Sequence, residues 1–225
     1  RVKKLEFKNV ESLSQSMQIN DFLQFEKKAW KSGYNKIAGV DEVGRGALAG
    51  PVVCAAVVFN KKFIQDNIHS TFKDLTDSKQ ISEKKRNKFF SILTNNKSIK
   101  VGIGTICNEE IDRINILAST HKAMIEASKK IIKDFILVDG LPVTGFDCKS
   151  TNIIKGDFLS ISISAASVIA KVTRDRIMLD MHQLYPQYRF DKNKGYGTAD
   201  HISALNKFGI SIIHRKTFKP VKDLI

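Results

Sequence analysis

The sequence predicts an α/β protein in which a mixed β-sheet is covered by helices. Two apolar segments, the second rich in β-branched residues, stand on either side of a glycine-rich loop, as in an antiparallel strand pair. Further along, short apolar segments alternate with long amphipathic ones, which is typical of strands that alternate with helices. The chain of 225 residues, 42% of them hydrophobic, is long enough to bury a full core.

Three regions are expected along the chain. Residues 1–35 form a basic and partly helical lead-in, residues 36–185 the main body, and residues 186–225 a polar, basic and glycine-bearing C-terminal lobe. The lead-in carries aromatic side chains that are candidate anchors onto the main body: Phe22, Phe25 and Trp30.

The first half of the main body contains three predicted strands and the beginning of a long helix. Residues 36–41 and 51–59 are the antiparallel pair, and residues 100–106 are a third strand. Between them, residues 82–93 form a helix that begins at Ser82 as N-cap. A long helix is expected over residues 109–133, with one apolar stripe made of Ile111, Ile114, Ala118 and Ile125.

The second half continues the alternation of strands and helices. Residues 135–138, wholly apolar, predict a strand that is buried on both faces, and residues 152–155 predict a further short strand. A second long helix is expected over residues 162–184, with a shared apolar face made of Ala165, Val168, Val172 and Leu179.

Composition limits the partners and the compartment. Lys and Arg outnumber Asp and Glu by 37 to 23, a formal charge of +14 that favours a polyanionic partner such as a nucleic acid, although a lysine-rich solvated surface would give the same count. The three cysteines are widely spaced without a CxxC pair, which indicates neither disulfides nor a zinc site. The longest apolar run, residues 47–59, is too short to span a bilayer. We therefore expect a cytoplasmic protein with no membrane partner.

The glycine loop has two possible interpretations. In AGVDEVGRGALAGP, residues 38–51, Gly44, Gly46 and Ala49 match the G-x-G-x-x-A pattern of dinucleotide-binding proteins. That pattern requires a helix directly after the glycines, whereas here Pro51 and a strand follow. Two carboxylates before the loop would also repel a pyrophosphate. The sequence therefore disfavours a dinucleotide site.

Four acids favour the alternative, a metal site. Asp41 and Asp139 end apolar strands, Glu42 follows Asp41, and Asp157 precedes the second long helix. Acids at the ends of neighbouring strands can converge, and hard divalent cations prefer such oxygen ligands. Because neighbours in a strand point to opposite faces, we expect the backbone to leave strand geometry at Glu42. Taken singly, each acid is equally consistent with a turn or a helix entry.

With these acids and several further motifs, the sequence resembles the bacterial ribonuclease HII family, the type 2 ribonucleases H. The motifs cover all but about the first thirty residues: AGVDEVGRG, GPVVCAAVVF, DSKQIS, IDRINIL, LVDG, KGD, ISAASVIAKVTRD, KGYGT and RKTFKPVK. The resemblance implies a ribonuclease H-like five-stranded mixed sheet flanked by helices, with residues 36–185 as the catalytic core and residues 186–225 as a helical, substrate-binding lobe. It also implies an endonuclease that hydrolyses RNA in RNA–DNA hybrids and nicks DNA on the 5′ side of an embedded ribonucleotide, as in ribonucleotide excision repair, leaving 3′-hydroxyl and 5′-phosphate ends.

The resemblance also implies roles for individual residues. The four catalytic acids that bind Mg²⁺ or Mn²⁺ are Asp41, Glu42, Asp139 and Asp157. The backbone of Gly44, Arg45 and Gly46 reads the ribose 2′-hydroxyl, and Tyr196 stacks on the adjoining deoxyribose.

Other polar residues are candidate phosphate contacts with structural alternatives. They are Lys79, Ser164, Ser167, Lys171 and Arg174. Ser164 has helix capping as its alternative, and Arg174 has solvent exposure. The five histidines show no metal-ligand spacing, so structural roles are expected for them. Nothing in the sequence demands an oligomer, and a monomer is expected.

Overall fold

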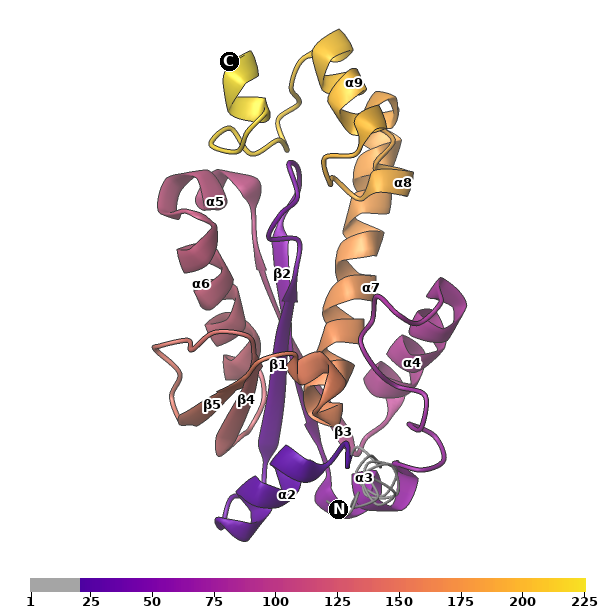
Figure 1. Cartoon of the computed structure of the whole chain (residues 1–225), viewed down its shortest axis with the longest axis vertical. Helices are drawn as coiled ribbons and strands as arrows, with labels where there is room; N and C mark the ends of the chain where they lie inside the picture. The colour runs from indigo at the N-terminus through magenta and orange to yellow at the C-terminus, as the bar shows by residue number, and fades with distance from the viewer. Residues whose placement is uncertain (1–20) are drawn as a thin grey trace, which may run out of the picture.

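The structure, a computed structural model, describes residues 21–225. A five-stranded sheet with the order β3-β2-β1-β4-β5 forms its centre (Figure 1). The strands are β1 (Ile37–Val43), β2 (Val52–Phe59), β3 (Ile99–Ile106), β4 (Phe135–Asp139) and β5 (Lys149–Ile153). β2 is antiparallel to both β1 and β3, whereas β4 is parallel to both β1 and β5. The predicted mixed sheet is thus confirmed.

Helices cover both faces of the sheet (Figure 1). On one face lie α5 (Asn108–Ile114) and α6 (Ile116–Lys129), which pack on Cys54 and Ala56 of β2. On the other lie α4 (Glu83–Asn95), α7 (Ile161–Leu184) and α3 (Lys61–Asn67), around Ala55 and Val57. β2 alternates its side chains between two apolar cores, which explains why the strand is buried along its whole length.

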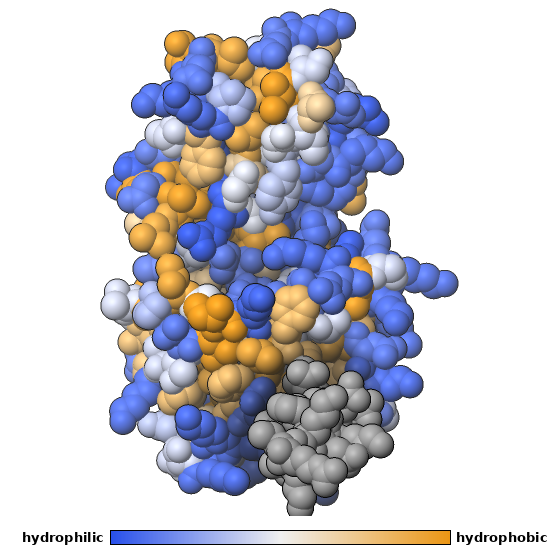
Figure 2. Space-filling model, in the orientation of Figure 1, coloured by the Kyte–Doolittle hydropathy of each residue, from blue (hydrophilic) through white to orange (hydrophobic). Residues whose placement is uncertain are grey.

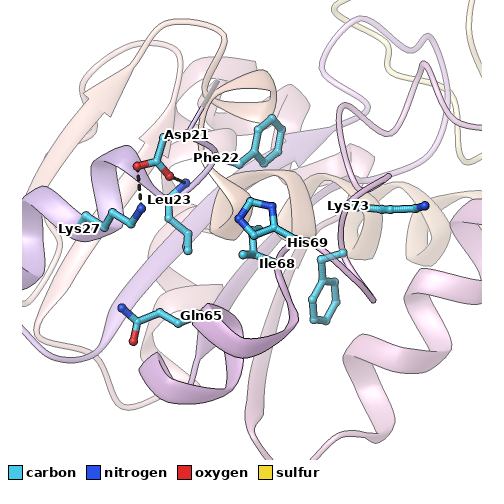
Figure 3. A pocket seen from close by; sticks show the side chains of 9 residues that line it. Asp21, Phe22, Leu23, Lys27, Gln65, Ile68, His69 and Lys73 are labelled. Carbon is cyan, nitrogen blue, oxygen red and sulfur yellow. Dashed lines mark hydrogen bonds and ion pairs between the residues drawn. The ribbon is translucent and has the colours of Figure 1, made fainter. Parts of the chain in front are cut away.

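The structure describes residues 21–35 of the lead-in, which contain one helix, while residues 1–20 lie outside the described residues. Its helix, α2 (Gln24–Lys31), follows Asp21, whose carboxylate accepts the Leu23 amide at 3.2 Å and the Lys27 Nζ at 2.8 Å (Figure 3). The expected aromatic anchors pack on the main body: Phe22, Phe25 and Trp30.

One predicted helix is two. The helix expected over residues 109–133 breaks at Asn115, whose φ of 68° lies in the left-handed region. The Asn115 side chain then accepts the Ala118 amide at 3.0 Å and caps α6. The break changes the orientation of α6 relative to α5, so the two helices do not share one apolar stripe. The predicted stripe is wrong at Ala118, which is exposed. The face of α6 that is buried instead consists of Ser119, Thr120, Ala123, Met124, Ala127 and Ser128.

Two smaller predictions also need correction. The strand expected at residues 152–155 is β5, residues 149–153; four of its five side chains are exposed, so it carries no apolar pattern that would mark its limits. Leu179 does not share a buried face with Val172, because it is 41% exposed. The first ten residues of α7, residues 161–170, are instead buried on every side, as expected for a helix in the interior.

The C-terminal lobe is helical and lies beside the loop between β1 and β2 (Figure 1). It contains η2 (Pro186–Tyr188), α8 (Phe190–Asn193), α9 (Ala199–Phe208) and η3 (Val221–Leu224). Its apolar cluster includes Tyr188 and Phe190, and it also takes in Leu48 and Ala49 of that loop. Figure 2 shows a mixed surface, with hydrophilic residues mainly along the margins of the face in view and hydrophobic residues between them. Within residues 21–225, no helix is long and apolar enough to cross a membrane.

Candidate active site

Three of the four predicted acids meet on one face of the sheet, where β1 and β4 lie side by side. Asp41, Asp139 and Asp157 each offer a carboxylate oxygen, and these oxygens all lie within 4.8 Å of one another. The parallel register pairs Val40 with Val138, so the next residues along the two strands, Asp41 and Asp139, are neighbours on the same face. Strand pairing thus brings together two acids that are far apart in sequence.

Asp157 reaches this cluster from the turn before α7. It lies in η1 (Gly156–Phe158), and the Gly156 amide donates to Asp139 Oδ1 at 2.6 Å. Gly39 of β1 packs against the backbone of the first turn of α7 with no room for a Cβ atom. This close approach of α7 to β1 brings Asp157, just before the helix, next to Asp139.

Ser164 holds Asp157 and does not face the solvent. It is fully buried, and its hydroxyl donates to the Asp157 carbonyl at 2.5 Å. The prediction that Ser164 contacts a phosphate does not fit this arrangement. Ser167 is similarly buried, with its hydroxyl 2.9 Å from that of Ser78. Helix capping, the alternative for Ser164, is also not its role, because the N-cap of α7 is Ser160.

Glu42 follows Asp41 in β1, but its side chain projects from the opposite face of the sheet. The prediction that the backbone leaves strand geometry at Glu42 is wrong: β1 continues to Val43, and Glu42 pairs with Cys54. Its side chain therefore points to the face that carries α6. The Glu42 carboxylate lies 3.4 Å from the Arg45 guanidinium and is not among the three that share the cluster.

The cluster is electrostatically strained. Burial raises the pKa of Asp41 well above its ordinary value, and the charges of Glu42 and Asp139 raise it further. Burial, together with the charges of Asp139 and Asp77, raises the pKa of Asp157 to about 6. Carboxylates this close resist ionising together, and a bound divalent cation would relieve that repulsion. The oxygen-only donor set fits Mg²⁺ or Mn²⁺.

A pocket of about 420 Å³ opens onto two of these aspartates. Its wall includes Lys79, as well as Asp77, a buried acid that the sequence analysis missed. Asp77 begins the DSKQIS motif but follows no predicted strand, so it was not among the candidate acids; it accepts the Lys79 amide at 2.9 Å. Burial alone would lower the pKa of Lys79, but the charges of Asp77, Asp41 and Asp157 raise it above its ordinary value. A cation therefore stands at the mouth of the acidic site.

Lys171 has a carboxylate partner of its own. Its ammonium lies 2.7 Å from Asp175, one turn further along α7, and both side chains are 19% exposed. The structure therefore does not bring Lys171 into the pocket with Lys79.

Two buried arginines hold the glycine loop by hydrogen bonds to its carbonyl groups. Arg174 of α7 donates to the carbonyls of Ala49 and Pro51, and Arg215 donates to those of Arg45 and Gly50. Both side chains are fully buried, so Arg174 is neither a phosphate contact nor solvent-exposed. Arg215 had no expected role, because a charged residue is ordinarily exposed and only tertiary contacts reveal that this one is buried.

The three residues of the GRG motif differ in their surroundings. Gly44 has a φ of 94°, and a Cβ atom there would lie 2.9 Å from the Pro51 carbonyl oxygen. At Gly46 no heavy atom lies within 4 Å of the position that a Cβ would take. Arg45 exposes 47% of its side chain. The loop therefore presents its Gly46 side to open space while Gly44 is packed against the body of the protein.

Tyr196 stands next to this loop. It forms an isolated bridge with Ala47, and the Leu48 amide donates to the Gly195 carbonyl at 2.8 Å. The half-buried Tyr196 ring lies over the Arg174 guanidinium, 5.3 Å from ring centroid to guanidinium carbon. One face of the ring is therefore supported by the cation.

Two histidines of the C-terminal lobe form a buried pair behind Tyr196. His201 Nδ1 lies 2.9 Å from the Tyr196 carbonyl, which can only accept, so this nitrogen carries the proton. The Ser211 amide donates to His214 Nδ1, so His214 is protonated on Nε2 and donates to His201 Nε2 at 3.0 Å. Both imidazoles are neutral and structural, as expected from their spacing.

We expect this pair to make the protein less stable in acid. Burial and the neighbouring His201 lower the pKa of His214 to about 4, whereas an unfolded histidine titrates near 6.5. The unfolded state therefore binds the proton first, and the stability present above pH 6.5 is lost as the pH falls towards 4. By pH 4 the loss should be about 3 kcal/mol in the free energy of unfolding.

The clustered carboxylates act in the opposite direction, because their raised pKa values favour the folded state at low pH. The measurement is therefore the difference in unfolding free energy between the unmodified protein and His214→Asn, which keeps an acceptor for Ser211 and does not titrate. That difference should shrink between pH 7 and pH 4. An equal difference at both pH values would contradict the assignment.

A five-stranded mixed sheet with aspartates clustered on its two interior strands β1 and β4 and on the turn before α7 defines a ribonuclease H-like protein, and comparisons with known proteins agree. The model of the family "Ribonuclease HII" matches residues 38–221. The ribonuclease HII of Acholeplasma laidlawii is 48% identical over 91% of this chain and 98% of its own, and that of Chlamydia trachomatis serovar L2 is 44% identical over 95% and 96%. The crystal structure of ribonuclease H2 from Pyrococcus horikoshii OT3 superimposes with a TM-score of 0.68 at 26% identity, over 84% of this chain and 96% of that one.

The chain belongs to the ribonuclease HII family. It is thereby an endoribonuclease of the ribonuclease H type, which hydrolyses RNA in RNA–DNA hybrids. The resemblance stated from the motifs is confirmed, and so is the extent of the chain that it covers.

Proposed function

We propose that the protein is a divalent-metal-dependent endonuclease that also nicks duplex DNA on the 5′ side of an embedded ribonucleotide, leaving 3′-hydroxyl and 5′-phosphate ends. The observation that carries the proposal is the cluster of Asp41, Asp139 and Asp157, whose carboxylate oxygens lie within 4.8 Å of one another. Such a cluster is costly in a protein that only binds nucleic acid, because it repels phosphate. It is favourable when a cation joins the acids to a phosphodiester.

The three aspartates would hold Mg²⁺ or Mn²⁺, with Glu42, whose side chain projects from the opposite face of β1, as a fourth acid. When bound, the ions supply an activated water and stabilise the leaving oxygen. The protein's own residues fix the acids beforehand: strand pairing aligns Asp41 with Asp139, and Ser164 holds the Asp157 segment. Such preorganisation is what a catalytic metal site requires.

The loop and the lobe would select the cleavage position. The backbone of Gly44, Arg45 and Gly46 would contact a sugar, and the open space beside Gly46, which supports this role, would admit the 2′-hydroxyl that distinguishes ribose from deoxyribose. Tyr196 offers its ring to the next sugar. Lys79, at the mouth of the acidic pocket, would bind a phosphate.

The two regions of the chain would have different roles. Residues 186–225 would form the substrate-binding lobe and residues 36–185 the catalytic core. In support of this, the buried apolar residues of the lobe form one cluster, which packs on Leu48, Ala49 and Met178 of the core. The metal ligands, the loop and Tyr196 all come from one chain, which supports a monomer acting on hybrids and on ribonucleotide-containing DNA. We place this activity in the cytoplasm, in the excision of ribonucleotides from DNA.

Metal dependence is the direct test. A DNA duplex holding one ribonucleotide is incubated with the protein and Mg²⁺, with Mn²⁺, or with excess chelator. We expect nicking with at least one of the metals and none with chelator, since attack on the phosphodiester depends on the cation. Binding without nicking under every condition would instead favour a nucleic-acid-binding protein that has lost its chemistry.

A further inference from the structure

Arg174 is a fully buried cation whose hydrogen bonds all go to backbone carbonyls. It forms none of the salt bridges found within residues 21–225. Its Nε donates to Pro51 at 2.9 Å, its Nη2 to Ala49 at 3.0 Å, and its Nη1 to Lys194 at 2.8 Å. All three nitrogens of the guanidinium are therefore used, in different directions.

These three carbonyls belong to two segments that are distant in sequence. Ala49 and Pro51 end the glycine loop, and Lys194, at a φ of 50°, precedes Tyr196 in the C-terminal lobe. The same guanidinium supports the Tyr196 ring at 5.3 Å, and its stem packs against Gly44 with no room for a Cβ. One side chain thus touches both elements to which sugar selection is assigned.

We propose that Arg174 is a specificity-determining positioning residue, which fixes the Gly44 to Gly46 backbone and the Tyr196 ring at the spacing of one ribose-to-deoxyribose step. This inference rests on the proposed function of the loop and of Tyr196. A planar guanidinium suits the task because its donors point along fixed directions, and hydrogen bonds from a charged donor are strong.

Lysine cannot replace arginine at this position. It keeps the charge, but it donates from a single nitrogen and cannot reach three carbonyls on two segments. The position of the glycine loop relative to the turn before Tyr196 would then no longer be fixed by one side chain. A misplacement of about 1 Å in a binding site can cost about a hundredfold in rate.

The test compares Arg174→Lys with Arg176→Lys, the same substitution on an exposed arginine two residues along α7. Each variant is assayed on a duplex with a single ribonucleotide and on a uniform RNA–DNA hybrid, which contains no ribose-to-deoxyribose step. For Arg174→Lys we expect kcat/KM to fall by about a hundredfold on the first substrate and by less than about tenfold on the second. Arg176→Lys should retain both activities.

The outcomes separate this inference from the proposed function. If the unmodified protein does not cleave the single-ribonucleotide duplex, the proposed function fails. If the unmodified protein cleaves that duplex, the ratio of its activities on the two substrates is compared with that of Arg174→Lys. An unchanged ratio overturns the positioning role, whether both activities are retained or both fall equally. Circular dichroism shows whether the variant is folded; if it is not, the neutral Arg174→Gln, which donates from one amide nitrogen, is put through the same assays and judged by the same ratio.

Discussion

Replacing Asp139 with asparagine is expected to lower kcat by about a thousandfold or more while leaving the affinity for the duplex within about tenfold. Asparagine keeps an oxygen that can accept the Gly156 amide, which Asp139 Oδ1 accepts at 2.6 Å, so the local geometry should persist. It removes one negative charge from the three-aspartate cluster, and a bound metal contributes several kcal/mol to such a reaction. Affinity comes mainly from phosphate contacts, which this change does not touch.

The two quantities are measured separately, kcat by nicking of a ribonucleotide-containing duplex with Mn²⁺ and affinity by fluorescence anisotropy without metal. Asp147→Asn is the matched control, since it makes the same substitution on a half-exposed acid that pairs with Lys133. It should leave kcat nearly unchanged. A fully active Asp139→Asn protein would remove Asp139 from the site and with it the metal cluster as described.

Replacing Gly46 with alanine is expected to abolish the preference for ribose without unfolding the protein. The added methyl group meets no heavy atom within 4 Å, so the fold can accept it, and the group projects into the space where a sugar would approach the backbone. Cleavage at a ribonucleotide should fall by about a hundredfold, because the sugar is held away from the loop. The ratio of cleavage on the ribonucleotide duplex to that on an all-DNA duplex is the measurement.

Gly44→Ala is the contrasting variant. Its φ of 94° and the nearby Pro51 carbonyl leave no place for a side chain, so this change should lower the melting temperature whereas Gly46→Ala does not. Unchanged selectivity in a folded Gly46→Ala protein would contradict backbone reading of the sugar.

The sequence predicted those features that depend on local pattern. Apolar runs located β1, β2 and β4. Acids at the predicted strand ends pointed to Asp139, which does end β4, and to Asp41, although β1 continues past Asp41 to Val43. The glycine spacing matched a dinucleotide pattern, but Pro51 and the predicted strand after it disfavoured that interpretation. The antiparallel pairing of β1 with β2 bears this out, because a strand and not a helix follows the glycines.

Features that depend on register or on tertiary contacts could not be predicted. Glu42 remains in the strand, so its side chain emerges on the other face from Asp41, a fact that only the pairing with Cys54 reveals. Arg174 is buried, whereas Arg176, two residues further along the same helix, is exposed, and no sequence pattern distinguishes the two. The helix break at Asn115 requires a left-handed residue that is not glycine, which sequence patterns seldom mark.

The position of the cut tests the central claim most directly, namely that the acids and the glycine loop act on the same sugar-phosphate step. A duplex with one ribonucleotide, labelled at each end in turn, is incubated with the protein and Mn²⁺, and the product ends are mapped. We predict a single nick on the 5′ side of the ribonucleotide, with a 3′-hydroxyl and a 5′-phosphate, and no nick in an all-DNA duplex. A cut on the 3′ side of the ribonucleotide, or equal cutting of the all-DNA duplex, would contradict the account.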